Sequence, residues 1–493
     1  MAPPEPSPAR YRLGPRSTRG LVAGWRAGQI ACVAIGLVLA VGFLRSIGGP
    51  SGGLLALAAA GGGVAMATWP VGGRTLEQWA PTLASFGIRA AADARHRPWQ
   101  GANRRPCGAL SSLALLELPE PGEWEPAWRE GLETLAERAR ASRAGRRPAR
   151  TPVSATGIGV LADATSHAWT SVLPVGGAGF ALLSEGDRVE RIAAWSGVLA
   201  AMARDTAGLY RLQWLSATYP AWLEDALPGG GSGLPGEHYA RLLEEASPEL
   251  WAHEVCVAVS VRRSTPRGSG VDGAAALLRE QLSTLGDRLR GAGLAPGPPL
   301  SPLALASLVR RSFEMAPIGT PAPWPWPVGI DDGWGHLRTD AAWHATYWVA
   351  EWPRCEVGGG FLLPLLLEPR LRRVVSVTMA PVAVVAAVRR AERDRTEGTA
   401  DAEMRRRHGF AMTARAAQEQ ESRQQREAEL AEGHAGYRYS GYVRLTEADQ
   451  DALERSCGRL EQSAALAQLE LRRLYGAQEE GYCCTLPTGR GCR

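Results

Sequence analysis

Two long apolar stretches without charge lie near the amino terminus. The first covers 27–44 and has a single strongly polar side chain, Gln29, and the second covers 52–71. Each approaches the roughly 20 residues that a helix needs to cross the hydrocarbon core. The pattern therefore predicts two transmembrane helices within 27–71. A secretory signal would have a shorter apolar region and a cleavage site, and a buried hairpin of a soluble protein is the other alternative.

Arginines predict the orientation of these spans. Five precede the first span within 1–26 and four follow the second, whereas the connecting loop has only Arg45. The positive-inside rule then places both termini in the cytoplasm, at a bacterial plasma membrane. Ala59, Gly63 and Ala67 share one face of the second helix, and small residues at this spacing favour close helix packing. The alternative is that they only fill a weakly apolar span.

After a predicted helical and basic linker region, 72–150, short apolar runs alternate with turns. The linker's arginines favour contact with membrane lipids. Period-two patterns predict strands and longer polar-apolar repeats predict helices. Strands are predicted at 157–163, 168–175, 179–184, 208–220, 253–263, 371–381, 437–445 and 469–475, and helices from 184 and over 271–292, 301–313, 358–368 and 447–466, the last with Thr446 as its cap.

The stretch WHATYWVAEWPR (343–354) predicts a strand with bulky groups on both faces. Pro353 has no N–H to donate and ends the strand. Side chains on both faces favour a strand that is covered on both sides, so this run is predicted to be core and not a partner groove or a membrane belt. The predicted core aromatic residues are Trp343, Tyr347, Trp348 and Trp352.

The order of elements predicts an α+β fold, in which a transmembrane hairpin precedes mixed α/β domains. The first cytosolic subdomain is 151–318 and the second is 336–489. The second has the order β-α-β-insert-β-α-β, a ferredoxin-like split β-α-β arrangement. Its insert, 383–433, alternates Arg with Glu as an exposed helical arm would.

The arm is predicted to contact partners. Met404, Phe410 and Met412 cluster near Gly409, where a two-helix arm would turn. Arg405, Arg406 and Arg407 could meet acidic partners or, less readily, nucleic acid. The plain alternative is a solvated helix that lies on its own domain.

The amino-acid composition limits the kinds of active site that the chain can form. The 493 residues include no lysine, so neither a Walker A loop nor a Schiff-base site can form. The eight histidines show no metal-binding spacing, and GxSxG is absent. The cluster of Cys483, Cys484 and Cys492 lacks a histidine partner, and adjacent Asp331 and Asp332 favour capping over metal binding. The sequence therefore predicts no cofactor, no metal and no enzyme.

Several segments resemble the non-motor amino-terminal domain of type IV secretion ATPases. They are YWVAEWPRCEVGGGFLLPLLL, VVSVTMAP, the charged hairpin ending in EADQDALERSCGRLEQ, and YCCTLPTG. The whole arrangement is similar to an actinobacterial membrane-protein family of conjugation-like clusters. The resemblance implies a scaffold that docks a separate motor ATPase among other inner-membrane subunits, in a homo- or hetero-oligomeric complex for DNA or protein export.

Two other functions stay open. The EccE component of the type VII system also has two amino-terminal spans and a cytosolic domain, so an EccE-like structural role is the first alternative. An unrecognised membrane-anchored enzyme is the second. The Leu486–Gly489 motif and the charged arm favour the type IV interpretation over the first alternative.

Overall fold

The chain divides into two compact units. The hairpin unit comprises Arg16–Gln100 with Tyr475–Ala477, and the sheet domain comprises Gly101–Leu474 with Gln478–Arg493 and the first fifteen residues. The computed structural model describes residues 27–71, 74–95, 109–118, 154–177, 179–204, 208–220, 251–262, 270–315, 325–327, 329–353, 355–382 and 436–491, with two single positions between 383 and 435.

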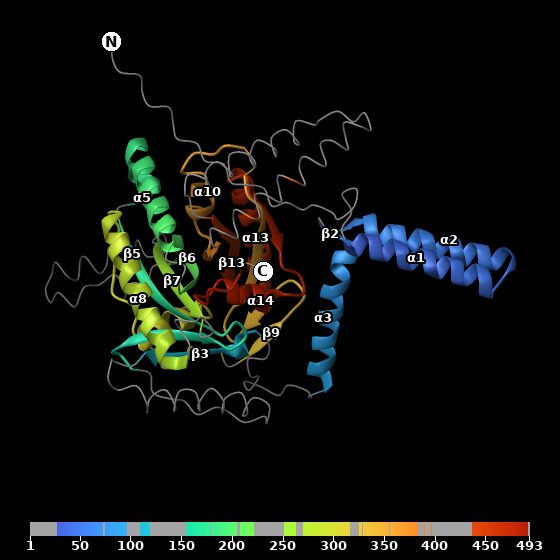
Figure 1. Cartoon of the computed structure of the whole chain (residues 1–493), viewed down its shortest axis with the longest axis horizontal. Coiled ribbons are helices and arrows are strands. Elements are labelled where there is room, and N and C mark those ends of the chain that lie inside the picture. Colours follow the sequence, from blue (N-terminus) through green and yellow to red (C-terminus); the bar gives the residue numbers. More distant parts are fainter. Residues whose placement is uncertain are drawn as a thin grey trace, which may run out of the picture. The chain divides into compact units, whose positions relative to one another are not determined.

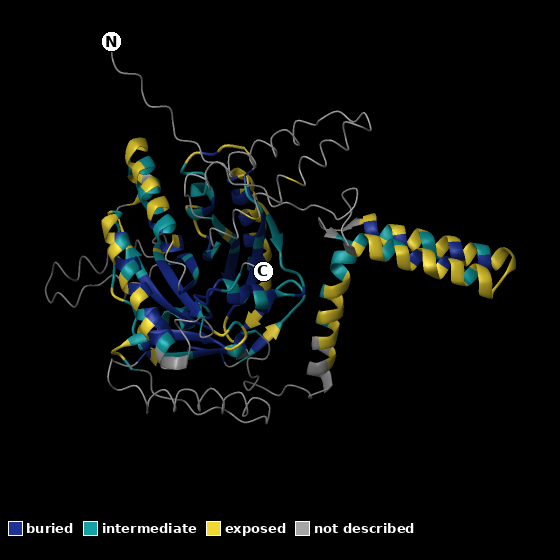
Figure 2. Ribbon diagram, viewed as in Figure 1, coloured by how far each residue is buried: buried dark blue, intermediate teal, exposed yellow. Residues whose placement is uncertain are grey.

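The hairpin unit is built on two antiparallel apolar helices. Their turn uses Gly48 and Gly49, whose φ angles of 55° and 69° suit glycine. Both helices are long and apolar enough to cross a membrane, and their large side chains face outward, with Val38 70% and Leu57 73% exposed (Figure 2). A soluble core hairpin would bury such side chains, so the membrane prediction is supported. The elements are α1 (Ala27–Ser46), α2 (Gly49–Thr68), β1 (Pro70–Val71), β2 (Arg74–Thr75) and α3 (Leu76–Arg95).

The sheet domain contains one large antiparallel sheet with helices on both faces (Figure 1), which confirms the predicted α+β class. The strand order is β3-β4-β5-β7-β6-β12-β13-β11-β10-β9, with β8 beside β5 and β14 beside β11. The strands are β3 (Leu113–Leu118), β4 (Ile158–Asp163), β5 (Ala168–Gly176), β6 (Leu209–Pro220), β7 (Trp251–Arg262), β8 (Ala295–Pro296), β9 (Ile330–Asp332), β10 (Leu337–Thr339), β11 (Trp343–Glu351), β12 (Arg373–Val382), β13 (Gly436–Glu447) and β14 (Glu470–Arg473).

The helices of the sheet domain come from both halves of the chain. They are η1 (Leu110–Ser112), η2 (Phe180–Leu182), α5 (Glu185–Arg204), α8 (Gly270–Gly291), α9 (Pro302–Arg311), α10 (Leu363–Leu366), α13 (Gln450–Leu466) and α14 (Gln478–Cys484).

The sheet holds two ferredoxin-like units in tandem. In the second unit, β11, β12, β13 and β14 follow one another along the chain, and they lie in the order β14-β11-β13-β12. The first unit repeats this arrangement, because β5, β6, β7 and β8 lie in the order β8-β5-β7-β6. The second of these units is the one that the element order predicts.

The two units join edge to edge through β6 and β12. This seam is antiparallel over seven residue pairs, from Arg373 opposite Thr218 to Met379 opposite Leu212. The strands of 151–318 and 336–489 therefore share one continuous sheet. In each unit the second and third strands pair directly where an insertion leaves the chain, Pro220 opposite Trp251 and Val382 opposite Gly436.

Each face of the sheet has its own helical layer. On one face, α5 and α8 cover the first unit around Val259 and Leu278, and α13 and α10 cover the second around Tyr347 and Leu460. Trp214 on β6 contacts both clusters and links them. On the opposite face, α9 and α14 pack over a third cluster. We call the latter the α9/α14 face.

Four local predictions differ from the structure. The stretch 179–184 is not a strand, because η2 leaves the sheet and Leu182 is 91% exposed. Strand β3 lies inside 72–150, where the arginine-rich composition hides a six-residue stretch that is apolar except for Glu117. The four prolines in 319–335 predict a loop without regular structure, but this stretch contains β9.

The fourth concerns the start of α13, whose cap is Asp449 and not Thr446. Asp449 accepts a hydrogen bond from the amide of Ala452 at 2.7 Å. Strand β13 runs on to Glu447, and the Thr446 hydroxyl is already bonded to His344.

Candidate functional site

Small residues form the contact between α1 and α2. The closest approach is between Gly36 and Gly63, because a Cβ on Gly63 would lie 2.8 Å from the carbonyl oxygen of Cys32 and 3.0 Å from the Cα of Gly36. Of the predicted packing residues, Gly63 and Ala67 are buried, while Ala59 is half-buried and offers its carbonyl toward Gly36. Gly36 was missed, since the sequence alone does not show which residues face each other.

A polar contact reinforces this helix pair. The Gln29 side-chain amide donates to the carbonyl oxygen of Ala67 at 2.7 Å. An interhelical hydrogen bond in an apolar environment contributes roughly 0.6–2 kcal/mol. The single polar residue of the first span thus serves helix association.

The aromatic strand β11 has packed side chains on both faces. Tyr347 is 1% exposed within the α13 cluster, and its hydroxyl donates to Glu461 at 2.9 Å. Trp343 and Trp352 pack at the margin of that cluster. Trp348 points to the α9/α14 face and is half-buried, so it is less enclosed than a core residue.

His344 is a neutral core residue on the α9/α14 face. Its ring nitrogens bond the hydroxyls of Thr339 and Thr446, both at 3.0 Å. Burial, together with the charges of Arg444 and Arg372, holds the pKa of His344 well below its usual value. Because each ring nitrogen of this neutral imidazole is already hydrogen-bonded to a threonine, neither is available for catalysis or metal binding.

The carboxyl-terminal segment 484–491, called the strap, crosses the middle of this face. Gln213 on β6 holds it at three points: its amide nitrogen donates to the carbonyls of Cys484 and Leu486, and its amide oxygen accepts from Gly489. Ser376 and Thr378 on β12 donate to the carbonyls of Cys484 and Arg490. The strap therefore bridges the seam between the two ferredoxin-like units.

Glycine is required where the strap lies on the sheet. Gly489 has a φ of 65°, and a Cβ there would collide with the Ser260 hydroxyl. The Leu486–Gly489 motif thus has a packing role in this fold.

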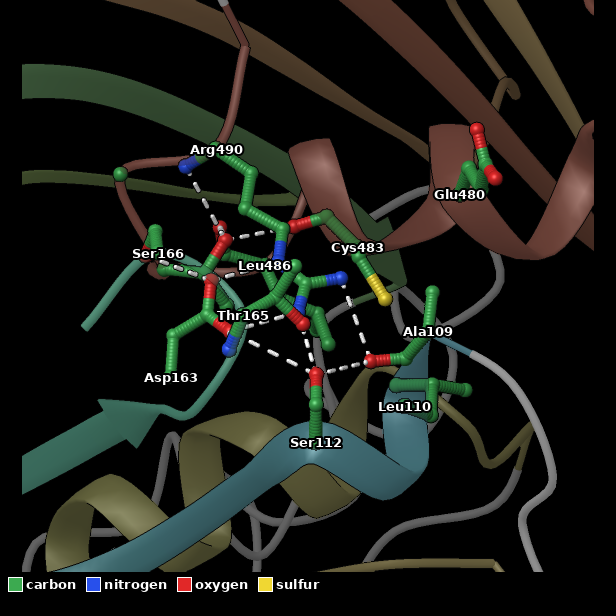
Figure 3. A network of polar contacts seen from close by, with 12 residues as sticks. Ala109, Leu110, Ser112, Asp163, Thr165, Ser166, Glu480, Cys483, Leu486 and Arg490 are labelled. Atoms are coloured by element: carbon green, nitrogen blue, oxygen red, sulfur yellow. Dashed lines mark hydrogen bonds and ion pairs between the residues drawn. The ribbon is translucent and has the colours of Figure 1, made fainter. Parts of the chain in front are cut away.

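The strap ends in a buried ion pair that ties it to the far edge of the sheet (Figure 3). Arg490 binds Asp163 through two parallel hydrogen bonds of 2.8 Å, with the side chains 15% and 2% exposed. The guanidinium also donates to Ser112 and to the carbonyl of Ala109. Ser166 and the amide of Thr165 complete the shell of Asp163.

Burial alone would raise the pKa of Asp163, but the hydrogen bond and charge of Arg490 outweigh it and lower that pKa. Both carboxylate oxygens of Asp163 accept hydrogen bonds from Arg490, so the ion pair has a structural role. No sequence pattern indicates this pair, because its partners are more than three hundred positions apart.

The other candidate ligands have structural roles. Asp332 accepts from the amide of Glu479 in the first turn of α14, which is the capping role that the sequence predicts. Cys483 is buried, and burial raises its pKa well above the usual value, so the thiol stays protonated. Across the described part of the chain, no group of three metal-binding side chains comes together. Cys492 and the arm 383–433, with Arg405, Arg406, Arg407 and Phe410, lie outside the described residues.

One segment of the chain is similar to a known protein family. A family model described as "Putative type VII ESX secretion system translocon, EccE" matches residues 257–349. The matched segment runs from β7 through α8 and α9 to the aromatic strand, so it includes part of each ferredoxin-like unit. No curated protein matches the chain.

The match supports a structural membrane component of a secretion system. The matched segment is similar to a type VII component. The match gives no support to the type IV resemblance, which therefore stays unconfirmed. Of the functions left open by the sequence, the EccE-like one agrees best with this match.

Proposed function

We propose that this chain is a non-catalytic membrane subunit of a type VII-like secretion translocon. The observation that carries the proposal is the match over 257–349, in a chain that also has two apolar helices of membrane-spanning length. The described polar clusters support it, since Arg490, Asp163, Gln213 and His344 are engaged in packing contacts. Its partners are other membrane subunits of the same machine. We also propose that a separate motor ATPase is one of these partners.

The proposed topology places both termini in the cytoplasm, which puts the sheet domain on that side. Its support is the arginine distribution around α1 and α2. Reporter fusions at Met1 and Arg493 test it, and a reporter that is exported at either end contradicts it.

The central experiment is affinity purification of the full chain from crosslinked native membranes. We expect secretion subunits to co-purify in a stable complex. A chain that is recovered alone, or with subunits of a type IV machine, would refute the type VII assignment. The neighbouring genes provide an independent check.

We further propose that the 383–435 insertion carries partner contacts. Because Val382 pairs with Gly436, a short turn can replace the insertion without removing a ladder hydrogen bond. We expect the shortened chain to fold but to lose membrane partners. The matched control replaces 221–250, which joins the equivalent strands of the first unit at Pro220 and Trp251. Normal assembly after removal of 383–435 would place the interface elsewhere.

A further inference from the structure

A cleft on the α9/α14 face has an unusual concentration of arginine. It lies where β6 meets β12, beneath the end of α9 and beside the end of α14, and has a volume of about 60 Å³. A single water needs roughly 10–15 Å³ by the same measure. Four arginines and one carboxylate, Glu254, line it; the arginines are Arg311, Arg372, Arg373 and Arg444.

Two of these arginines already have partners. Arg311 forms an ion pair with Glu254 at 2.6 Å, and these side chains are 31% and 44% exposed at the mouth of the cleft. Arg373 donates to the carbonyls of Glu368, Leu371 and Leu366 and so closes the end of α10. The ion pair accounts for Arg311, and the three carbonyls with the nearby charge of Glu368 account for Arg373, although the buried Nε of Arg373 has no hydrogen-bond partner among the described residues.

The burial of the other two arginines, Arg372 and Arg444, is not explained by an ion pair. They are 8% and 2% exposed, and within the described ranges no carboxylate forms an ion pair with either of them. Arg444 donates to the Thr485 hydroxyl and stacks over Tyr482, but its buried Nε has no hydrogen-bond partner among the residues that the structure describes. Arg372 donates to the carbonyl of Arg311 and to the sulfur of Met315.

Both groups are charged at neutral pH, because the arginine guanidinium is not deprotonated in proteins. Burial and the charge of Arg444 lower the pKa of Arg372 to about 10. Glu447 acts on Arg372 only from a distance, and its carboxylate is bonded to Ser456. Two buried like charges that no described carboxylate contacts are costly, because each loses hydration and repels the other.

We propose that this cleft binds a phosphate dianion, either free or as the monoester group of a nucleotide. The two guanidinium charges, which no described carboxylate contacts, match the charge of a phosphate monoester at pH 7, and their planar N–H groups suit its oxygens. Arg311 at the mouth can add a third contact. This site is independent of the proposed secretion role.

The test is calorimetric titration of inorganic phosphate into the detergent-solubilised full chain in chloride buffer. We expect saturable binding with one site per chain. Arg372→Gln should weaken the affinity at least tenfold, and Arg372→Lys, which keeps the charge but loses the planar donors, should weaken it less. The matched control is Arg290→Gln, which removes an exposed arginine paired with Asp287 on α8 and should bind as the original chain does.

Absence of saturable binding by the unaltered chain up to about 10 mM phosphate would overturn the site. Equal affinity in Arg372→Gln and Arg290→Gln would do the same. Competition by AMP identifies a nucleotide phosphate as the source, whereas phosphate binding that AMP does not displace identifies the free anion. The unaltered chain alone suffices for the first criterion, so a variant that fails to fold does not leave the site untested.

Discussion

Replacement of Arg490 by glutamine tests whether the strap holds the sheet domain together. The change removes the charge that compensates Asp163, which is 2% exposed and cannot regain water without local opening. Breaking a buried ion pair in this way costs about 3–5 kcal/mol. Ser166 and Thr165 still bind the carboxylate, so we expect about 3 kcal/mol.

This cost can be measured as a shift in thermal unfolding. Domains of 150–250 residues shift by roughly 2–4 °C per kcal/mol, and the sheet domain is larger, so the change corresponds to roughly 4–6 °C. The assay is tryptophan fluorescence of the solubilised full chain, with Trp169 as one of the buried reporters. Asp163→Asn and the double variant complete a cycle, in which the double variant should cost less than the two single changes added together.

The pH dependence provides an independent readout. The folded-state pKa of Asp163 is lowered, so its contribution is present above the unfolded value of about 3.9 and is lost as pH falls through the folded value. Asp163→Asn should flatten that part of the acid profile. A shift below about 1 °C in Arg490→Gln, the scale of a surface change, would refute a structural role for the strap.

Three further predictions concern the helix pair, the aromatic strand and the thiols. Gly63→Leu should separate α1 from α2 and lower recovery from membranes, whereas Gly62→Leu, where a side chain meets open space, should not; equal recovery would contradict the packing. Tyr347→Ala should cost about 3–5 kcal/mol in thermal or denaturant unfolding and Trp348→Ala clearly less, because only Tyr347 is fully enclosed; a larger loss at Trp348 would reverse this assignment. A maleimide should label exposed Cys355 in the folded chain and spare buried Cys483, and mass spectrometry that finds Cys483 labelled first would contradict its burial.

The sequence predicts the second ferredoxin-like unit because its signals are local. Alternation in 343–351 and 437–445, together with prolines that stop strands, marks the elements in the right order. The first unit escaped recognition for a physical reason. Its fourth strand, β8, is only two residues long and contains Pro296, so no period-two pattern can reveal it.

The functional features that were missed depend on long-range contacts. The contact role of Gly36 shows only when α1 packs against α2. The Arg490–Asp163 pair joins the strap to strand β4. The clearest local clue was Gln213, a buried amide inside the apolar strand β6, since such a group must find hydrogen-bond partners. Sequence reasoning identifies such a residue as unusual, but it cannot name the strap as its partner.

The duplicated sheet explains how one compact domain can carry two large insertions. In each unit the insertion leaves between the second and third strands, which remain directly paired at its base. Because β6 and β12 are antiparallel neighbours, their carboxyl ends lie at opposite ends of the seam, so the insertions after Pro220 and Val382 depart at opposite ends as well. The strap crosses between these ends and bonds to β6 and β12 alike. The strap is thus bonded to both strands from which the insertions leave, and Gln213 and the Arg490–Asp163 pair hold it against the first unit.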